Sequence, residues 1–294
     1  MTDLQEDRYA GLSGLVLTNP ELELGHGVVL RQTYAHLFAP FMMAFTPAVG
    51  KQPHPGPWKA ARGGLAQEIT AELFIPASTT ERLGTTNAVA QAVVFALRLG
   101  VNPATSLAVF SNRPFTPEDQ SSDDGAWVML VDVEPRRFSL AVDYGVPNEA
   151  AARWVADRWP TALKFTKESA EFALAADALN VGQYVHRSAL TIVSLWASLE
   201  ALFSPSTSEL KFRVSSLIAA YLEPPGERRQ ARAMAISKLY DKRSSAAHGK
   251  PNHETSHVLD SFNLVREVLT KMLDQRHIPS KSELERLLYG ASIE

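Results

Sequence analysis

Apolar residues in the first half of the chain occur in short runs, separated by glycine, proline and polar residues. Runs of this kind predict β-strands. We expect strands at residues 12–17, 21–24, 28–31, 68–75, 106–110 and 127–133. One helix is expected at residues 87–99, where Gly100 supplies a stop signal. Two segments rich in proline, glycine and polar side chains, 50–64 and 114–125, are expected to be exposed loops.

From about residue 148 the apolar residues recur every three or four positions, which is the period of an amphipathic helix. The pattern predicts a short helix from Asn148 that Pro160 closes or kinks, followed by a helix that Thr161 caps and Gly182 ends. Further helices are expected at residues 184–203, 208–222, 227–248 and 254–275. The first of these four is apolar on nearly every side, which is typical of a helix in the middle of a bundle.

These two patterns predict an α+β protein. We expect a mixed α/β domain at residues 1–147, with a sensing or recognition role, and an all-helical domain at residues 148–294. The longest apolar stretch, residues 37–45, is far shorter than the roughly 20 residues that cross a bilayer. The acidic, polar start also lacks the pattern of a secretory signal. We therefore expect a cytoplasmic protein that does not contact a membrane.

Net charge and cysteine content limit which ligands and which kinds of site are expected. The formal net charge is −3, so attraction to nucleic acid requires a local group of cations. The expected helices at 208–222 and 227–248 contain such a group: Lys211, Arg213, Arg228, Arg229, Arg232, Lys238, Lys242 and Arg243. The absence of cysteine excludes disulfides and thiolate metal sites.

Arg243 and His248 lie near the end of one predicted helix. An arginine and a histidine at this spacing are expected roughly 0.5 times by chance in such a composition, and Arg31 with His36 is a second match. Both residue types also stabilise the negative end of a helix dipole. Residues five apart on a straight helix lie about 140° apart around its axis. The helix must therefore end or distort near His248, as Gly249 suggests, or the two side chains must reach a site from different sides.

Three blocks around this pair carry a family resemblance. The chain reads LYDKRSSAAHG at residues 239–249 and LWASLEALF at residues 195–203, with KFRVSSLIA between them at residues 211–219. Their order and spacing resemble the HEPN family, in particular its Apea-like branch. Ser244 departs from the Asn, Asp or His that follows the arginine in many ribonuclease members of the family, which puts catalysis in question rather than the fold.

The resemblance implies a helical bundle that forms a homodimer and cuts RNA without a metal or another cofactor. Arg243 and His248 would be the catalytic pair, with Tyr240 and Ser244 supporting them, and the pairs of two subunits would face one another. Such an enzyme would be a toxin or an antiviral defence effector. The alternative is a non-catalytic HEPN module that binds RNA, a nucleotide or a protein partner.

The chemistry of these residue types suits that role. Arginine offers a planar fork of donors to phosphate oxygens, and histidine can relay the proton of a 2′-hydroxyl or of a leaving 5′-oxygen. RNA contacts are expected from Arg213, Lys238 and Lys242. Glu200, inside the most apolar helix, needs a cation, for which Arg243 and Arg213 are the candidates. It would act as an ion-pair partner or in proton transfer.

Two other sets of residues are candidates for a functional site. His253, Glu254 and His257 match the HExxH pattern of zinc metalloproteases, with Glu283 or Glu285 as the remaining candidate ligand. The first domain has no catalytic signature. In its loop at 50–64, three side chains, Trp58, Lys59 and Arg62, are candidates for contact with a ligand or a regulatory protein.

Overall fold

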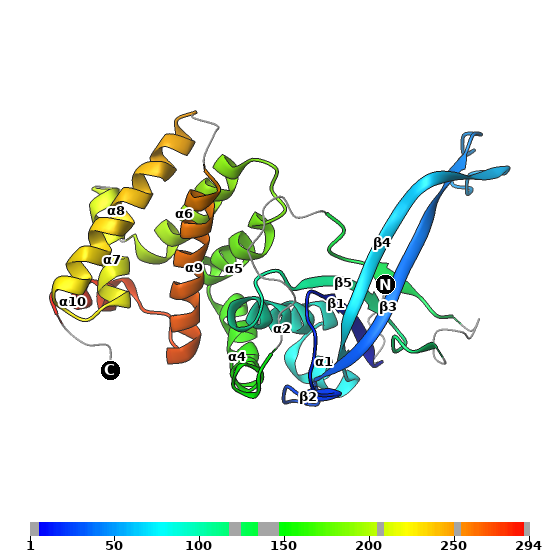
Figure 1. Ribbon diagram of the computed structural model, residues 1–294, viewed down its shortest axis with the longest axis horizontal. Helices are drawn as coiled ribbons and strands as arrows, with labels where there is room; N and C mark the ends of the chain where they lie inside the picture. The colour runs from blue at the N-terminus through cyan, green and yellow to red at the C-terminus, as the bar shows by residue number, and fades with distance from the viewer. Residues whose placement is uncertain (1–5, 118–124, 135–146, 205–208, 250–253, 291–294) are drawn as a thin grey trace. The chain divides into compact units, whose positions relative to one another are not determined.

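The computed structural model describes residues 6–117, 125–134, 147–204, 209–249 and 254–290 (Figure 1). Its contacts divide the chain into two compact units. The first consists of Met1–Ala90, Thr105–Val133 and Tyr144–Asn148, and the second of Gln91–Ala104, Glu134–Asp143 and Glu149–Glu294. An antiparallel sheet followed by a set of helices confirms the α+β class. Within the described ranges, no helix is long and apolar enough to cross a membrane.

The first unit is built on an antiparallel sheet. Its strands are β1 (Arg8–Ser13), β2 (Glu21–Glu23), β3 (Val29–Ala44), β4 (Trp58–Ile75), β5 (Ser106–Ser111) and β6 (Val128–Leu130). They lie in the order β2-β3-β4-β1-β5-β6. Two helices, α1 (Ala77–Leu83) and α2 (Thr86–Gly100), connect β4 to β5. Because β1 lies between β4 and β5, its side chains are among the most deeply buried, as Ala10 and Leu12 show.

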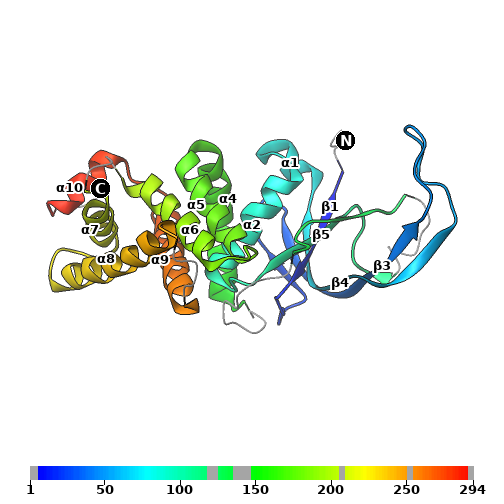
Figure 2. The same ribbon diagram turned by 90° about the horizontal axis from the view of Figure 1, so that it is seen from above.

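The hairpin of β3 and β4 corrects the expectation of a loop at residues 50–64. Strand β4 already begins at Trp58, and the two strands continue well past the other strands of the sheet (Figure 2). In this part of the hairpin both faces are exposed. A strand that buries neither face has no reason to alternate apolar and polar residues, so the usual signal of a strand is absent from its sequence.

A bulge bends this hairpin where Gly64 lies opposite Pro40. The φ angle of Gly64 is +158°, and a Cβ atom there would lie 2.3 Å from the carbonyl oxygen of Ala39. Only glycine fits this position without moving the backbone of the neighbouring strand.

The second unit is helical. It contains α4 (Glu149–Glu168), α5 (Ala170–Gly182), α6 (Ser188–Phe203), α7 (Leu210–Leu222), α8 (Glu227–Ala247), α9 (Thr255–Gln275) and α10 (Lys281–Leu288). Helix α6 packs against α5, α7, α8 and α9, which confirms the prediction that the most apolar helix is central. The end of α2 also belongs to this unit, where the rings of Phe95 and Phe172 meet edge to face. Sequence analysis had placed that whole helix in the first domain.

The expectation that Pro160 closes the helix is wrong, because α4 continues past this residue to Glu168. Its buried stripe includes Val155, Trp159 and Leu163, so packing on both sides of the proline compensates for the missing backbone hydrogen bond. The next helix is capped by Ser169, not Thr161: the Ser169 hydroxyl accepts a hydrogen bond from the backbone N–H of Phe172.

Candidate functional site

Glu200 of α6 forms a compact polar cluster with two side chains of α8, Tyr240 and Arg243; we call these three residues the Glu200 cluster. Arg243 Nη2 lies 3.0 Å from Glu200 Oε1 and donates to Oε2 at 3.1 Å. The Tyr240 hydroxyl donates to Oε1 at 2.9 Å. The Glu200 and Arg243 side chains are only 16% and 22% exposed. The predicted need of Glu200 for a cation is therefore confirmed, with Arg243 as the partner.

Helix geometry explains why these residues meet. Tyr240 and Arg243 are three positions apart on α8, so both project from one side of it toward α6. The Arg243 guanidinium also lies over the Tyr240 ring, 5.4 Å from its centre. One turn before Glu200, Trp196 meets the Tyr240 ring edge to face at 5.1 Å and donates from Nε1 to the Ser261 hydroxyl of α9 at 3.1 Å. The cluster is thus supported by three helices.

His248 lies at the end of α8, apart from the Glu200 cluster. The helix ends at Ala247, His248 is its C-cap, and Gly249 follows with a φ of +87°. The backbone N–H of His248 donates to the carbonyl of Ser244, which is half-buried. The imidazole is exposed, and no hydrogen bond or ion pair joins it to another described residue. The expected end of the helix near His248 is confirmed, but within one chain the structure does not join His248 to Arg243.

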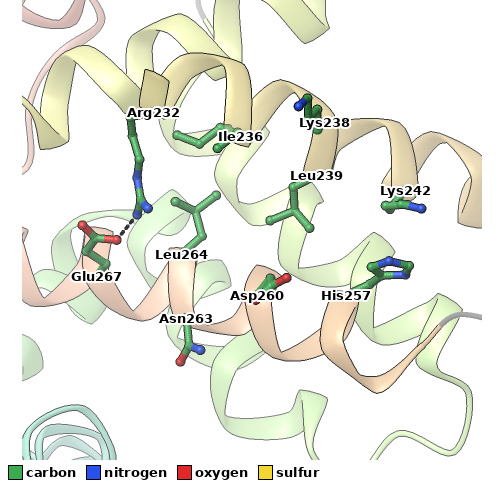
Figure 3. Close-up of a pocket in the computed structure, with 11 residues that line it drawn as sticks. Arg232, Ile236, Lys238, Leu239, Lys242, His257, Asp260, Asn263, Leu264 and Glu267 are labelled. Atoms are coloured by element: carbon green, nitrogen blue, oxygen red, sulfur yellow. Dashed lines mark hydrogen bonds and ion pairs between the residues drawn. The ribbon is translucent and has the colours of Figure 1, made fainter. Parts of the chain in front are cut away.

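A groove of about 410 Å³ lies between α8 and α9 (Figure 3). Lys238 and Lys242 line it from α8, and His257, Asp260 and Asn263 line it from α9 (Figure 3). Its remaining walls are Ala235, Ile236, Leu239 and Leu264, and an ion pair between Arg232 and Glu267. The two lysines were expected from the sequence as RNA contacts, and His257 only as a candidate zinc ligand. Asp260 and Asn263 were missed, because they look like ordinary surface positions of an amphipathic helix.

The eight clustered cations are not equally available to RNA. Half of them bind within the protein: Lys211 to Asp241, Arg232 to Glu267, Arg243 to Glu200, and Arg229 to the carbonyls of Glu223 and Leu287. Arg213 is half-buried, and its Nε atom is buried without a hydrogen-bond partner in the described part of the chain. Arg228, Lys238 and Lys242 are exposed, as is the ion-paired Lys211. Two of the three predicted RNA contacts therefore face solvent.

The geometry gives little support to a zinc site. His257 Nε2 is 4.0 Å from the exposed Glu254 carboxylate, and His253 lies outside the described residues. Glu283 instead forms the capping box of α10 with Ser280. Hydrogen bonds from Ser280, with a smaller contribution from His277, lower the pKa of Glu283 to about 2. Among the residues that the structure describes, no three His, Asp or Glu side chains are grouped as metal ligands would be.

In the second arginine–histidine pair with this spacing, Arg31 and His36, the arginine has a structural role in the sheet. Arg31 lies on β3, where its Nε donates to Glu21 at 2.9 Å and its guanidinium lies 4.7 Å from the centre of the Phe74 ring. It also approaches the buried Glu72 at 3.5 Å. His36 is exposed further along the same strand. Arg31 thus stabilises the sheet.

Tyr240 gives a pH dependence by which the cluster can be tested. Burial raises its pKa, the hydrogen bond and negative charge of Glu200 raise it further, and the pKa reaches about 12. An unfolded tyrosine has a pKa of about 10. The stability that depends on protonated Tyr240 is therefore complete below about pH 10 and is lost as the pH rises toward 12.

We expect the urea midpoint of the wild-type protein to fall between about pH 10 and 12, and that of Tyr240→Phe to fall less. An equal fall in both proteins would contradict this. Tyr221, whose pKa burial also raises, is expected to contribute a fall in the same direction in both proteins.

Comparisons with protein-family models, with curated proteins and with solved structures found no match.

Proposed function

We propose that the helical unit is a metal-independent endoribonuclease in which Arg243 binds the scissile phosphate and His248 transfers protons. The observation that carries the proposal is the Glu200 cluster, because it fixes an arginine five residues before an exposed histidine at the end of the same helix. A guanidinium has five N–H donors, and both recorded bonds to Glu200 use Nη2. Donors therefore remain for phosphate oxygens.

The proposed reaction needs only these groups. The 2′-oxygen of the RNA attacks the adjacent phosphorus, and its proton passes to a neutral imidazole. The bond from phosphorus to the 5′-oxygen breaks, and this oxygen takes a proton from an imidazolium. The products are a 2′,3′-cyclic phosphate and a 5′-hydroxyl. Arg243 stabilises the charge that develops on the phosphoryl oxygens.

Two copies of the chain supply the two histidines of this reaction. Residues five apart on a helix lie about 140° apart, so one α8 cannot easily direct Arg243 and His248 at the same phosphate. In a homodimer that brings two helical units together, the partner's His248 would complete the site. The groove lysines, Lys238 and Lys242, would hold flanking phosphates, since Lys242 adjoins Arg243 on α8.

The second candidate is RNA binding without cleavage. It is favoured by the position of His248, which makes no recorded contact with the Glu200 cluster, and by the ion pair that already engages Arg243. A groove with lysines on one wall and an apolar floor would still bind a nucleotide or an RNA strand.

Incubating the full-length protein with end-labelled RNA in EDTA separates these candidates. Cleavage that persists in EDTA and leaves a 2′,3′-cyclic phosphate is the expected result. RNA binding without cleavage would favour the second candidate. Cleavage that EDTA abolishes would contradict the proposal, because a metal ion would then supply the chemistry.

A further inference from the structure

The hairpin of β3 and β4 extends beyond the sheet as a two-stranded arm, which we define as residues 33–67 (Figure 1). Strand β2 pairs with β3 only up to Arg31, and β1 pairs with β4 only from Ala71. Along the arm, the outer edges of both strands therefore have no strand partner within the described residues. A two-stranded ribbon with exposed faces and free edges is marginally stable by itself.

The arm exposes many large apolar side chains. Exposed fractions are 68% for Tyr34, 64% for Phe38, 58% for Phe41, 66% for Phe45 and 49% for Trp58, and Met42, Met43 and Val49 are also exposed. A buried aromatic side chain covers about 150–250 Å², so these five leave roughly 500 Å² of ring surface in water. One side of a standard protein interface buries about 800 Å². Neighbouring residues of a strand point to opposite faces, so Phe41 and Phe45 lie on the other face from Phe38, and the rings of one face supply only part of that area.

Charge is distributed unevenly along the arm. Residues 33–67 contain no Asp or Glu, and their three cations, Lys51, Lys59 and Arg62, all lie in the far part. At the near end, Glu23 of β2 and Glu68 of β4 are exposed. The arm therefore runs from an acidic base to a basic far end.

These features favour a protein partner over a membrane or RNA. The exposed apolar side chains are spread along the strands from Tyr34 to Phe45, whereas the turn carries Lys51, His54 and several prolines. A hairpin that inserts into a membrane would carry its apolar residues at the turn. Three cations are few for RNA, where phosphate contacts supply most of the affinity.

We propose that the arm is a dimerisation element that packs against the arm of a second copy of the chain. The two arms lie antiparallel about a two-fold axis, so that the basic far end of each meets the acidic base of the other. A parallel arrangement would place like charges together. The antiparallel one buries the aromatic side chains on one face of each arm and pairs Lys59 and Arg62 with Glu23 and Glu68 of the partner subunit.

This proposal goes beyond the ribonuclease proposal and does not rest on it. If both hold, paired arms would raise the local concentration of the two helical units and favour the composite site. If RNA is not cleaved, the arm would still form a dimer.

The test is the mass of the full chain in solution, measured by analytical ultracentrifugation. The wild-type protein is expected to be a dimer. Lys59→Glu with Arg62→Glu makes both ends of the arm acidic, and Glu23→Lys with Glu68→Lys makes both ends basic. Each double variant alone is expected to be monomeric, with a Kd raised at least tenfold. An equimolar mixture of the two is expected to form a heterodimer, which also shows that both variants are folded.

A second pair of variants tests the apolar contact. Phe38→Ser with Phe41→Ser is expected to dissociate the dimer, whereas Leu190→Ser, at a position on α6 that is 61% exposed, is expected to leave it intact. A monomeric wild-type protein at tens of micromolar, or a mixture of charge variants that stays monomeric, would overturn the proposal. If the wild-type protein is monomeric and the arm variants lose binding to RNA, the arm would instead be an RNA-binding element. If they lose binding to anionic vesicles, it would be a membrane-binding element.

Discussion

Replacing His248 with alanine is expected to lower the rate of RNA cleavage by about 10²–10⁴-fold, which is the usual contribution of a positioned acid or base. The imidazole is exposed at the end of α8 and contributes no recorded side-chain contact, so its loss should leave the urea midpoint unchanged. A loss of activity without a loss of stability is the expected signature of proton transfer. The measurement is the initial rate of cleavage of a labelled RNA in EDTA.

His186→Ala is the matched control, because His186 is an exposed histidine of the same helical unit. It should cleave RNA at the wild-type rate. Arg243→Lys provides the complementary variant, since lysine keeps the charge but loses the planar fork of donors. It should bind RNA with nearly wild-type affinity and cleave it slowly. Wild-type cleavage in His248→Ala would exclude this histidine from the reaction.

Replacing Trp196 with alanine is expected to lower the free energy of unfolding by about 3–5 kcal/mol. The indole is fully buried, packs against the Tyr240 ring and bonds to Ser261, so its removal leaves a cavity among α6, α8 and α9. The Glu200 cluster should loosen with it. Urea unfolding followed by circular dichroism at 222 nm measures the helical unit directly.

Two further variants show how much of the effect of Trp196 on the free energy of unfolding comes from its hydrogen bond and how much from its packing. Ser261→Ala keeps the packing but leaves the indole N–H unpaired, which should cost about 1–3 kcal/mol. Leu190→Ala removes an exposed side chain from the same helix and should cost at most about 0.5 kcal/mol. If Trp196→Ala were as mild as Leu190→Ala, the packing of α6 at the centre of the unit would be wrong.

Sequence patterns predicted the parts of the fold that bury one face. The long helices from α6 to α9 were found to within a few residues, because their apolar stripes are continuous. The pattern failed where packing overrides a local signal, as at Pro160 in α4. It also failed for α10, although Ser280 and Glu283 have the spacing of a capping box.

The same limits apply to the candidate site. Glu200 was found because a carboxylate in an apolar helix needs a partner, and Arg243 was one of two candidates for it. Sequence could not show that half of the clustered cations bind internal acceptors, because these partners lie on other helices or far along the chain. The far part of the arm was missed because neither of its faces is buried there.

The support of Tyr240 from three helices also has a consequence for the protein during its synthesis. Glu200 and Trp196 leave the ribosome first, and Arg243 follows with α8. Ser261 comes last of these, because it lies on α9. A nascent chain that ends before α9 has Arg243 but lacks the hydrogen bond that orients Trp196 beneath Tyr240. If the site cuts RNA, this order of assembly would delay its activity until α9 has been synthesised.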